Sequence, residues 1–491
     1  MKKRILCLVT ALAAAFTMAG CSKEQTTALK DDENEPYEIE WYFPGSFGAD
    51  QDMVNEKANE YLKDKLNVTL KLMPLDWGVY VSKTSNMINS GEKMDLVWTD
   101  ISRLPNYVNQ QIPVQIDELM DEYAPETKAM LGEDFLAGAK IDHKLYAIPA
   151  NKEKAHGTTI VYRKDIADKY GFDMSEVHTI EDMYPYFDIL KEREPGMVCF
   201  GANHTGSTPV SVTSDGVNFY NVGGADLVMF SDAEPDKIIC KYESESYKNA
   251  VKNAAYMHEK GYIDPDVAIK DNFSELKTNG DVFCWKDVYH PTKLEELNKS
   301  YDYELGQVLI TDITSDATDA MGSLMYIPYT CENPVRVMKF VELFNTDPYL
   351  NNLINFGIEG VHYEKTGENT IKTLDKINDY DFVGSQWELG NTMINYILDG
   401  YSTDRYEKLN AFNDEIEYSK YYGFVFDMEE VDTEVTACQS VVSEYWKNLD
   451  FGSAADWETE LASFLDKLNK AGLEDVKAAA QRQYDEWKKA E

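Results

Sequence analysis

The stretch EIEWYF, residues 38–43, decides the fold, because its apolar and polar side chains alternate as they do along a β-strand. The same alternation returns in residues 68–72 (VTLKL), and a short apolar run, DLVWT, occupies residues 95–99. Between these segments, apolar side chains recur at helical spacing over residues 54–66, and residues 80–89 can form a second helix. The order strand, helix, strand, helix, strand predicts a parallel sheet with right-handed crossovers.

Three loops follow the predicted strands, at residues 44–50 (PGSFGAD), 74–78 (PLDWG) and 100–103. In open α/β sheets, ligands bind in the crevice outside the carboxyl ends of the strands. The three loops are therefore expected to face one cleft. The candidate ligand-binding residues on them are Asp50, Trp77 and Asp100.

A second α/β region extends from about residue 158 to residue 290, and residues 282–285 (VFCW) are expected to form one of its short strands. Near the end of the chain, apolar side chains recur at helical spacing over residues 431–449 and again over residues 473–487. The C-terminal part of the chain is therefore expected to be helical.

The N-terminus has the pattern of an export signal. The first four residues carry three positive charges, and residues 5–18 are almost wholly apolar but too short for a membrane span, which needs about 20 residues. The next residues, Met18-Ala19-Gly20-Cys21, resemble a bacterial lipobox, in which the cysteine is lipidated and becomes the first mature residue. We therefore expect a signal peptide over residues 1–20 and a flexible tether over residues 21–36.

Composition restricts the partners. The chain has 491 residues and a formal net charge of −40 at pH 7, so it should repel nucleic acid and anionic lipid surfaces. Its length implies two or three domains. Nothing in the sequence indicates a cofactor or an oligomer. We expect a monomer that reaches the membrane through the lipid on Cys21.

The sequence lacks the common signatures of catalysis: it has no P-loop, no GxGxxG, no HExxH and no EF-hand loop. Carboxylate pairs for glycoside hydrolysis carry no information in a chain with 87 acidic residues. The spacing of the acidic residues Asp312, Asp316 and Asp319 is irregular for calcium. The cysteines beyond Cys21 are scattered without metal-binding spacing and are expected to be buried apolar residues. We expect neither an enzyme nor a metal site.

The tryptophans divide into two groups. Three of them, Trp77, Trp285 and Trp387, lie at the ends of predicted elements among polar residues. Aromatic faces beside hydrogen-bonding side chains suit a sugar, whose CH faces stack while its hydroxyls pair. Partial burial in a core is the alternative for each of them. The remaining five are expected to pack in cores: Trp41, Trp98, Trp446, Trp457 and Trp487.

Several longer segments resemble a known family, the extracellular solute-binding lipoproteins of bacterial ABC importers, family 1, in the subgroup with a helical C-terminal domain of unknown function. The resemblance rests on INSGEKMDLVWTD (88–100), YAIPANKE (146–153), VYRKDIADKYGFD (161–173), TIEDM (179–183), NFGIEGVHYEK (355–365), ELGNTMINY (388–396) and GFVFDMEEVDTEVTACQSVVSEYW (423–446). These segments are spread over most of the mature chain, and residues 357–364 are the most specific part.

The resemblance implies an α/β, two-lobed periplasmic-binding-protein-like fold (type II) with an interlobe cleft and a helical C-terminal region. Lobe one would comprise residues 37–150 and a later return of the chain at about 295–350. Lobe two would comprise residues 151–294, and residues 351–491 would pack on the lobes. The residues implied near the cleft are Trp77, Asp100, Asn151, Trp285 and Trp387, with Gly360, His362 and Tyr363 shaping a nearby loop.

The expected function is that of a non-enzymatic receptor on the outer face of the bacterial cytoplasmic membrane. It would capture a carbohydrate, in particular an oligosaccharide, and deliver it to the permease subunits of an ABC importer. The sequence leaves open a receptor for peptides or other small solutes. A surface glycoside hydrolase and a structural or adhesive lipoprotein are less favoured, because no catalytic pair is marked and the cleft loops are well formed.

Overall fold

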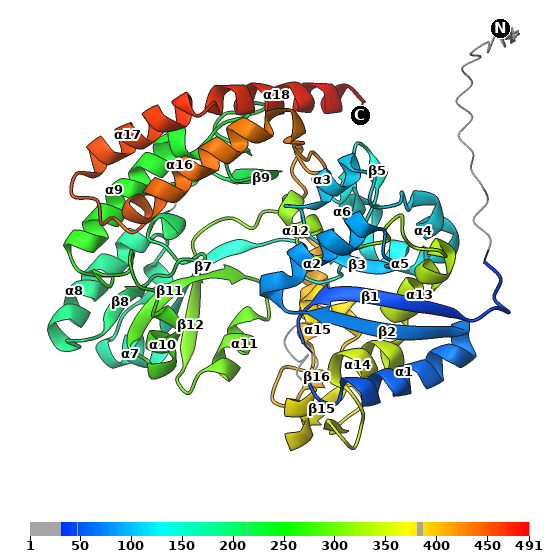
Figure 1. The fold of residues 1–491 in the computed structure, drawn as a ribbon. Coiled ribbons are helices and arrows are strands. Elements are labelled where there is room, and N and C mark those ends of the chain that lie inside the picture. Colours follow the sequence, from blue (N-terminus) through cyan, green and yellow to red (C-terminus); the bar gives the residue numbers. More distant parts are fainter. Residues whose placement is uncertain (1–30, 47, 214, 381–385, 491) are drawn as a thin grey trace, which may run out of the picture.

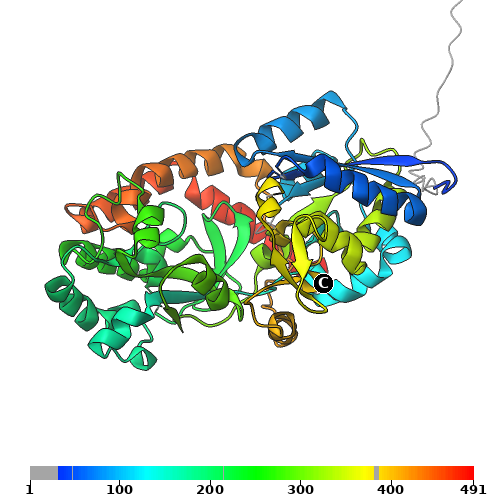
Figure 2. The same cartoon turned by 90° about the horizontal axis from the view of Figure 1, so that it is seen from below.

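The computed structural model describes residues 31–490 apart from residues 47, 214 and 381–385 (Figure 1). Two α/β bodies lie side by side, and a group of C-terminal helices lies along one edge of the second body. Viewed from below, the two bodies form an elongated molecule (Figure 2). The predicted signal peptide and Cys21 lie outside the described residues. Within the described residues, no helix is long and apolar enough to cross a membrane.

Lobe one is built on the mixed sheet that the opening segment predicts. Its strands in spatial order are β2 (Val68–Leu75), β1 (Tyr37–Pro44), β3 (Leu96–Thr99), β13 (Leu324–Tyr326) and β6 (Ile148–Pro149). The first three strands run parallel, β13 is antiparallel to β3, and the edge strand β6 is antiparallel to β13. Helices α1 (Gln51–Leu66) and α2 (Trp77–Ser90) make the two crossovers. Ile39, Trp41 and Phe43 are fully buried, as the alternation in residues 38–43 requires.

Smaller elements complete lobe one. They are α3 (Leu104–Asn109), α4 (Asp117–Tyr123), α5 (Pro125–Leu131), α6 (Glu133–Ala137), the hairpin β4 (Lys140–Ile141) and β5 (Lys144–Leu145), α12 (Ala317–Met321), α13 (Pro334–Thr346) and α14 (Pro348–Phe356). A small sheet of β14 (Tyr363–Lys365), β15 (Thr370–Thr373) and β16 (Ile397–Leu398) follows α14.

Lobe two has its own sheet, in the order β12 (Leu305–Leu309), β7 (Gly157–Arg163), β11 (Val282–Tyr289) and β8 (Val198–Gly201). The helices around it are α7 (Lys164–Tyr170), α8 (Tyr184–Arg193), α9 (Glu245–Glu259), α10 (Phe273–Asn279) and α11 (Lys293–Ser300). The expected return to lobe one at residue 295 was wrong, because β12 pairs with β7 along residues 305–309. The chain leaves lobe two only after residue 309.

The chain crosses between the lobes along neighbouring segments. His156 and Thr314 exchange two backbone hydrogen bonds, with N···O distances of 3.0 and 2.9 Å, so the outgoing segment pairs with the returning one. Beside them, the imidazole Nδ1 of His156 lies 2.9 Å from a carboxylate oxygen of Asp319 on α12. Asp319 also accepts a hydrogen bond from the backbone of Asp316, forming a capping box at the start of α12.

The C-terminal helices belong physically to lobe two (Figure 1). Helices α16 (Asp432–Asp450), α17 (Trp457–Lys470) and α18 (Leu473–Ala490) share a buried cluster with α9 and with the hairpin of β9 (Phe219–Gly224) and β10 (Val228–Ser231). In this cluster, Phe230 stacks on Tyr421 at a centroid distance of 4.0 Å. The C-terminal region also contacts lobe one. The rings of His143 and Trp487 stack with centroids 6.1 Å apart, and the side-chain amide of Asn109 donates to the carboxylate of Asp427 at 2.9 Å.

The N-terminal end of the described chain is held on lobe one. Asp31 and Arg336 form an ion pair at 2.7 Å, with 4% and 1% of their side chains exposed. Burial alone would raise the pKa of Asp31, but hydrogen bonds from Arg336, Asn333 and Lys339 outweigh it and hold the pKa at about 2. The tether was expected to extend to residue 36. This ion pair corrects that boundary, because the chain is anchored by Asp31.

Candidate functional site

Three tryptophans meet where the strands of lobe one end, and we call them the aromatic platform: Trp77, Trp98 and Trp387. Trp77 is the first residue of α2, after the helix cap Asp76, whose carboxylate accepts from the backbone of Gly78. The rings of Trp77 and Trp387 are nearly parallel, 14° apart in orientation, with centroids 6.3 Å apart. They are 47% and 40% exposed, so ring surface on both remains open to a ligand.

Trp98 packs against Trp77 of this pair. It is buried in β3, meets Trp77 edge to face at 5.3 Å, and donates its indole N–H to the Ser323 hydroxyl at 2.8 Å. The guanidinium of Arg103 lies 5.5 Å from the Trp98 ring. Asp100 accepts two hydrogen bonds from Arg103 and one from the hydroxyl of Ser102. Asp100 therefore fixes the loop and the arginine beside the platform.

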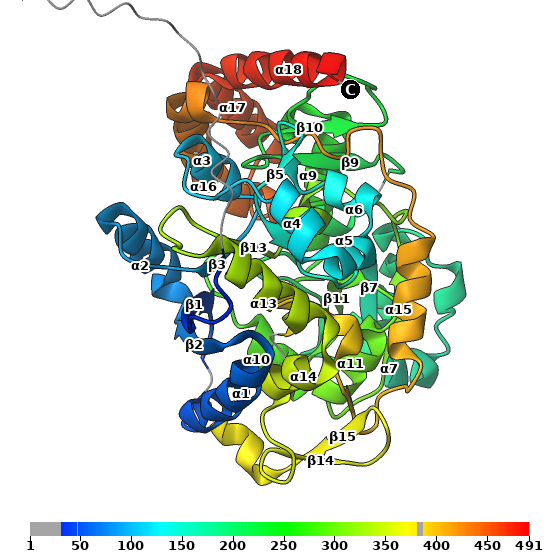
Figure 3. The same ribbon diagram turned by 90° about the vertical axis from the view of Figure 1, so that its right-hand side faces the viewer.

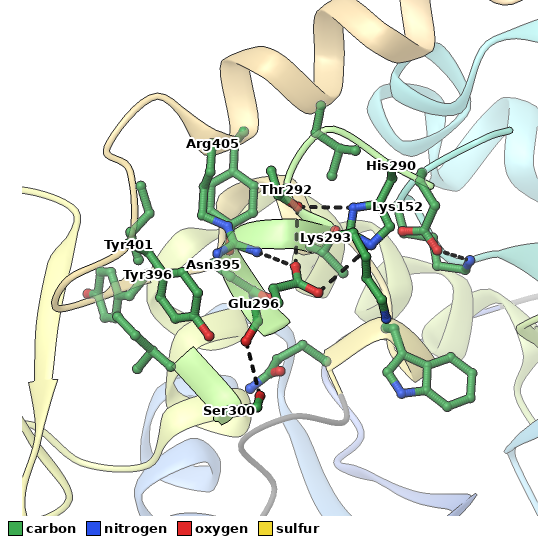
Figure 4. A pocket seen from close by; sticks show the side chains of 18 of the residues that line it. Lys152, His290, Thr292, Lys293, Glu296, Ser300, Asn395, Tyr396, Tyr401 and Arg405 are labelled. Carbon is green, nitrogen blue, oxygen red and sulfur yellow. Dashed lines mark hydrogen bonds and ion pairs between the residues drawn. The ribbon is translucent and has the colours of Figure 1, made fainter. Parts of the chain in front are cut away.

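A cavity of about 470 Å³ adjoins the platform at Trp387, and we call it the hinge cavity (Figure 4). Lobe two contributes β11 residue Val288, the segment after β11, and α11, whereas lobe one contributes Phe356 and residues 392–398. Helix α15 (Arg405–Asp414) closes it on one side. Figure 3 shows α2 and α15 at opposite edges of the molecule. Trp387 belongs to both the platform and the lining of the hinge cavity, so the two adjoin at that residue.

The polar groups of the hinge cavity form a connected set (Figure 4). The Glu296 carboxylate accepts hydrogen bonds from Arg405 at 2.7 Å and from the Thr292 hydroxyl at 3.2 Å. Thr292 also lies 3.1 Å from Nδ1 of His290. Burial lowers the pKa of His290, which favours the neutral imidazole at neutral pH. The rings that border these groups are Phe356, Trp387, Tyr396, Tyr401 and Tyr406.

This arrangement suits non-covalent binding of a polyhydroxyl ligand. The volume of the hinge cavity, about 470 Å³, falls in the range of about 300–1,000 Å³ that is usual for small-molecule pockets. Flat rings can pack on apolar faces, while carboxylate, guanidinium, hydroxyl and amide groups offer both donors and acceptors. Within the described residues, no group of three His, Cys, Asp or Glu side chains is arranged to hold a metal ion.

Two residues predicted near the cleft have structural surroundings instead. Trp285 lies in the buried part of β11, 1% exposed, in a lobe-two cluster with Phe273 and Leu305. Asn151 is buried in the crossing segment, where its side-chain amide donates to the Asn391 side chain at 2.9 Å. For Trp285 the prediction was wrong, because β11 continues to residue 289 and pairs on both sides.

The remaining predicted residues lie together, outside the lining of the hinge cavity. Asp50 precedes α1 and pairs with Nε2 of His362 at 3.3 Å and with Lys376 at 3.0 Å. Nδ1 of His362 accepts from the backbone of Ile358, and the side chain is fully buried. Tyr363 is buried in a small cluster with Phe356. These contacts give Asp50, His362 and Tyr363 a role in holding the loop after α14.

Sequence reasoning missed most of the hinge cavity. Glu296 and Arg405 are separated by more than 100 residues and belong to helices with no distinctive motif. Only the aromatic content of residues 396–406 (YILDGYSTDRY) is an available signal, since three tyrosines there line the cavity. Trp98 was assigned to a core, which its burial confirms, but its contact with Trp77 was not foreseen.

Comparisons with known proteins show the fold and the family of the chain. The chain is 25% identical over 493 residues to a carbohydrate ABC transporter substrate-binding protein of Streptococcus pneumoniae, covering 99% of this chain and 97% of the relative. Among solved structures, the N-glycan transport solute-binding protein NgtS of the same species has a TM-score of 0.82 at 24% identity, covering 92% of this chain and 99% of that one. The S. pneumoniae substrate-binding protein FusA in complex with kestose has a TM-score of 0.63 at 16% identity, covering 92% and 100%.

These likenesses confirm the two-lobed α/β fold that was expected from the sequence. A domain of unknown function, DUF3502, matches residues 420–489, which confirms the expected C-terminal domain. The model of the bacterial extracellular solute-binding proteins matches residues 56–358, more than half of the chain. The protein therefore belongs to the bacterial extracellular solute-binding proteins.

Proposed function

We propose that this protein is the substrate-binding protein of a bacterial ABC importer for carbohydrates, and that its ligand is an oligosaccharide. The observation that carries the proposal is the half-exposed, parallel pair Trp77 and Trp387 at the border of a polar cavity between the lobes. The names of the relatives support it, since they refer to carbohydrate, N-glycan and fructooligosaccharide transport.

The protein acts as a receptor and does not turn its ligand over. A ligand that contacts the platform on lobe one and Glu296 or Thr292 on lobe two is bound more tightly when the lobes approach. It then shifts the population toward the closed form by its differential affinity for that form. The closed form is the species that the permease subunits recognise, and the sugar passes to them intact.

The lipid on Cys21 holds the receptor at the outer face of the cytoplasmic membrane, close to its permease. Tethering raises the local concentration of receptor without any new contact. Replacement of Cys21 by serine should move the protein from the membrane fraction to the medium and abolish incorporation of labelled palmitate. Retention of Cys21→Ser at the membrane would contradict the proposed anchor. Light scattering of the tether-free protein should give the mass of a monomer.

The sugar proposal is tested by a thermal-shift screen, because a ligand that binds only the folded state raises its apparent stability. The probes are Man1GlcNAc, Man5GlcNAc, kestose and a set of tri- to pentapeptides. We expect at least one oligosaccharide, and no peptide, to raise the melting temperature. The shift should disappear in Trp387→Ala and persist in Trp457→Ala, which alters a tryptophan of the C-terminal helix α17. A shift with peptides alone would show that the receptor serves another solute.

A further inference from the structure

A second cavity, of about 520 Å³, lies within lobe two, and we call it the lobe-two cavity. Its lining comes from residues 208–213, β9, α9, Lys286 within β11 and the crossing segment 311–316. Helix α16 adds its last residue, Asp450, so the C-terminal domain takes part in the wall. The residues that line the lobe-two cavity differ from those of the hinge cavity.

The lobe-two cavity lies next to the part of lobe one that carries the platform. Strand β9 forms one of its walls through Phe219 and Asn221. Two residues further along the strand, a Cβ on Gly223 would lie 3.5 Å from a side-chain carbon of Ile101. Ile101 directly follows Asp100, the residue that fixes Arg103 beside Trp98. One strand thus connects the lobe-two cavity to the platform loop.

Several acids of the lobe-two cavity already have donors within the protein. Asp316 accepts from the backbone of Thr318 at 2.8 Å and from the backbone of Asn221 at 3.0 Å. Asp226 accepts from the side-chain amide of Asn221 at 2.7 Å. Asp450 accepts from the Tyr247 hydroxyl at 2.8 Å. Their positions are therefore fixed before any ligand enters, and each carboxylate retains further acceptor capacity.

Two lysines of the lobe-two cavity lack such partners. Among the described residues, no carboxylate forms an ion pair with the ammonium of Lys241 or Lys286, and Lys241 lies over the Tyr242 ring at 5.2 Å from its centroid. Lys286 is half-buried within β11, and burial lowers its pKa. A half-buried ammonium with unused donors is costly unless something else accepts its hydrogen bonds. A ligand oxygen placed in the cavity would do so.

The charge of the lining selects the class of ligand. Five aspartates and two lysines line the lobe-two cavity, so a carboxylated sugar would meet a net negative wall. A neutral sugar avoids this repulsion and can accept from the lysines while donating its hydroxyls to the fixed carboxylates. The threonine and serine hydroxyls of the wall serve the same purpose, among them Thr158, Thr208, Ser211 and Ser246.

We infer that the lobe-two cavity is a second subsite of the same receptor, that it takes a neutral sugar residue of the oligosaccharide, and that Lys286 and the C-terminal domain's Asp450 contact that residue. The inference rests on the proposed function, because it assigns a further part of one ligand. It gives the C-terminal domain a part in ligand recognition.

The first test changes Lys286 to methionine, which keeps most of the side-chain volume and removes the ammonium. Titration calorimetry uses the oligosaccharide that gives the largest thermal shift with the wild-type protein, from Man1GlcNAc, Man5GlcNAc and kestose. Loss of a hydrogen bond from a charged donor should weaken binding roughly tenfold or more. The matched control is Lys248→Met, because Lys248 lies on α9 with its side chain 54% exposed and outside the lobe-two cavity. Its affinity should equal that of the wild type.

Asp450→Asn is the second variant, because asparagine keeps the shape and can still accept from Tyr247. It should weaken the same oligosaccharide, and a tri-uronate from alginate should bind the wild-type protein at least tenfold more weakly than the neutral probe. Unchanged affinity in both Lys286→Met and Asp450→Asn would overturn the subsite while leaving the proposed function intact. Equal affinity for the uronate would overturn the charge selection. If the wild-type protein binds none of the three sugars, the proposed function fails first and the subsite with it.

Discussion

The same substitution at two tryptophans should have opposite effects. Trp77 and Trp285 were both predicted to contact ligand, yet Trp77 is 47% exposed and Trp285 is 1% exposed. Changing each to alanine removes the same atoms. We expect Trp285→Ala chiefly to lose stability, and Trp77→Ala chiefly to lose ligand binding with a smaller loss of stability.

The magnitudes follow from the contacts. Trp285 packs edge to face on Phe273 and Tyr301, with ring centroids 6.3 and 5.9 Å apart, and its deletion leaves a core cavity. Such a truncation costs about 3–5 kcal/mol of unfolding free energy. Trp77→Ala loses one edge-to-face contact and one offset stack, each worth about 0.5–1.5 kcal/mol, so the substitution should cost about 1–3 kcal/mol of unfolding free energy. Trp77 is a central aromatic anchor of the proposed site. Its replacement by alanine should therefore weaken binding by at least about 2 kcal/mol, or about thirtyfold in affinity.

Both variants are measured by thermal unfolding and by titration with the best oligosaccharide of the screen. Trp285→Ala should melt well below the wild-type protein, and below its melting temperature it should retain affinity within a few-fold. Trp77→Ala should melt between Trp285→Ala and the wild type and bind at least thirtyfold more weakly. Trp77→Ala could be destabilised as much as Trp285→Ala, or could bind the oligosaccharide with wild-type affinity. Either result would show that the platform only packs the fold and that the proposed site is wrong.

Three further outcomes are expected. Arg336→Ala should lower the unfolding free energy by about 1.5–3 kcal/mol, because it removes charged hydrogen bonds to the buried carboxylate of Asp31, which keeps Asn333 and Lys339; a change below about 1 kcal/mol in urea unfolding would contradict the anchoring role. Burial raises the pKa of Asp450 to about 6, so the folded state holds that proton more tightly than the unfolded state and loses stability as pH rises from about 4 to 6, by at most about 3 kcal/mol. Asp450→Asn should therefore melt above the wild type at pH 7.5 and level with it at pH 4; an equal difference at both pH values would rule out this titration. Arg405→Ala should weaken oligosaccharide binding by about tenfold in calorimetry, because Glu296 loses its 2.7 Å partner in the hinge cavity, and unchanged affinity would place the ligand elsewhere.

The local pattern of the sequence predicted the fold well where one element determines the next. Alternation and helical spacing in residues 38–99 located β1, α1, β2, α2 and β3, because each must bury one apolar face. The start of α2 was placed three residues late, since Trp77 and Val79 are exposed and add nothing to the apolar pattern. The helical cap at Asp76 was the available signal.

The site was predictable only where a residue type is unusual for its position. A tryptophan at an element end is such a case for Trp77 and Trp387, and the structure brings these two together. The polar pair after Trp285 suggested a strand end there, but β7 continues to pair with β11 as far as Tyr289. Glu296 and Arg405 could not be found, because their meeting depends on how α15 lies against lobe two. That packing is a long-range outcome with no local pattern.

The distribution of buried side chains explains how such a receptor can close without losing its fold. Within the described residues, one large cluster surrounds the sheet of lobe one, and separate clusters lie on the sheet of lobe two. Between the lobes, polar pairs such as Asn151 with Asn391 and His156 with Asp319 line the crossing segments. A hinge motion therefore rearranges surface contacts and leaves each core packed. Helices α16–α18 share a core with lobe two and must move with it, so Asp450 keeps its place in the lobe-two cavity while the platform approaches on the other lobe. A ligand that spans both then gains contacts only as the lobes close, which is the differential affinity that closure requires.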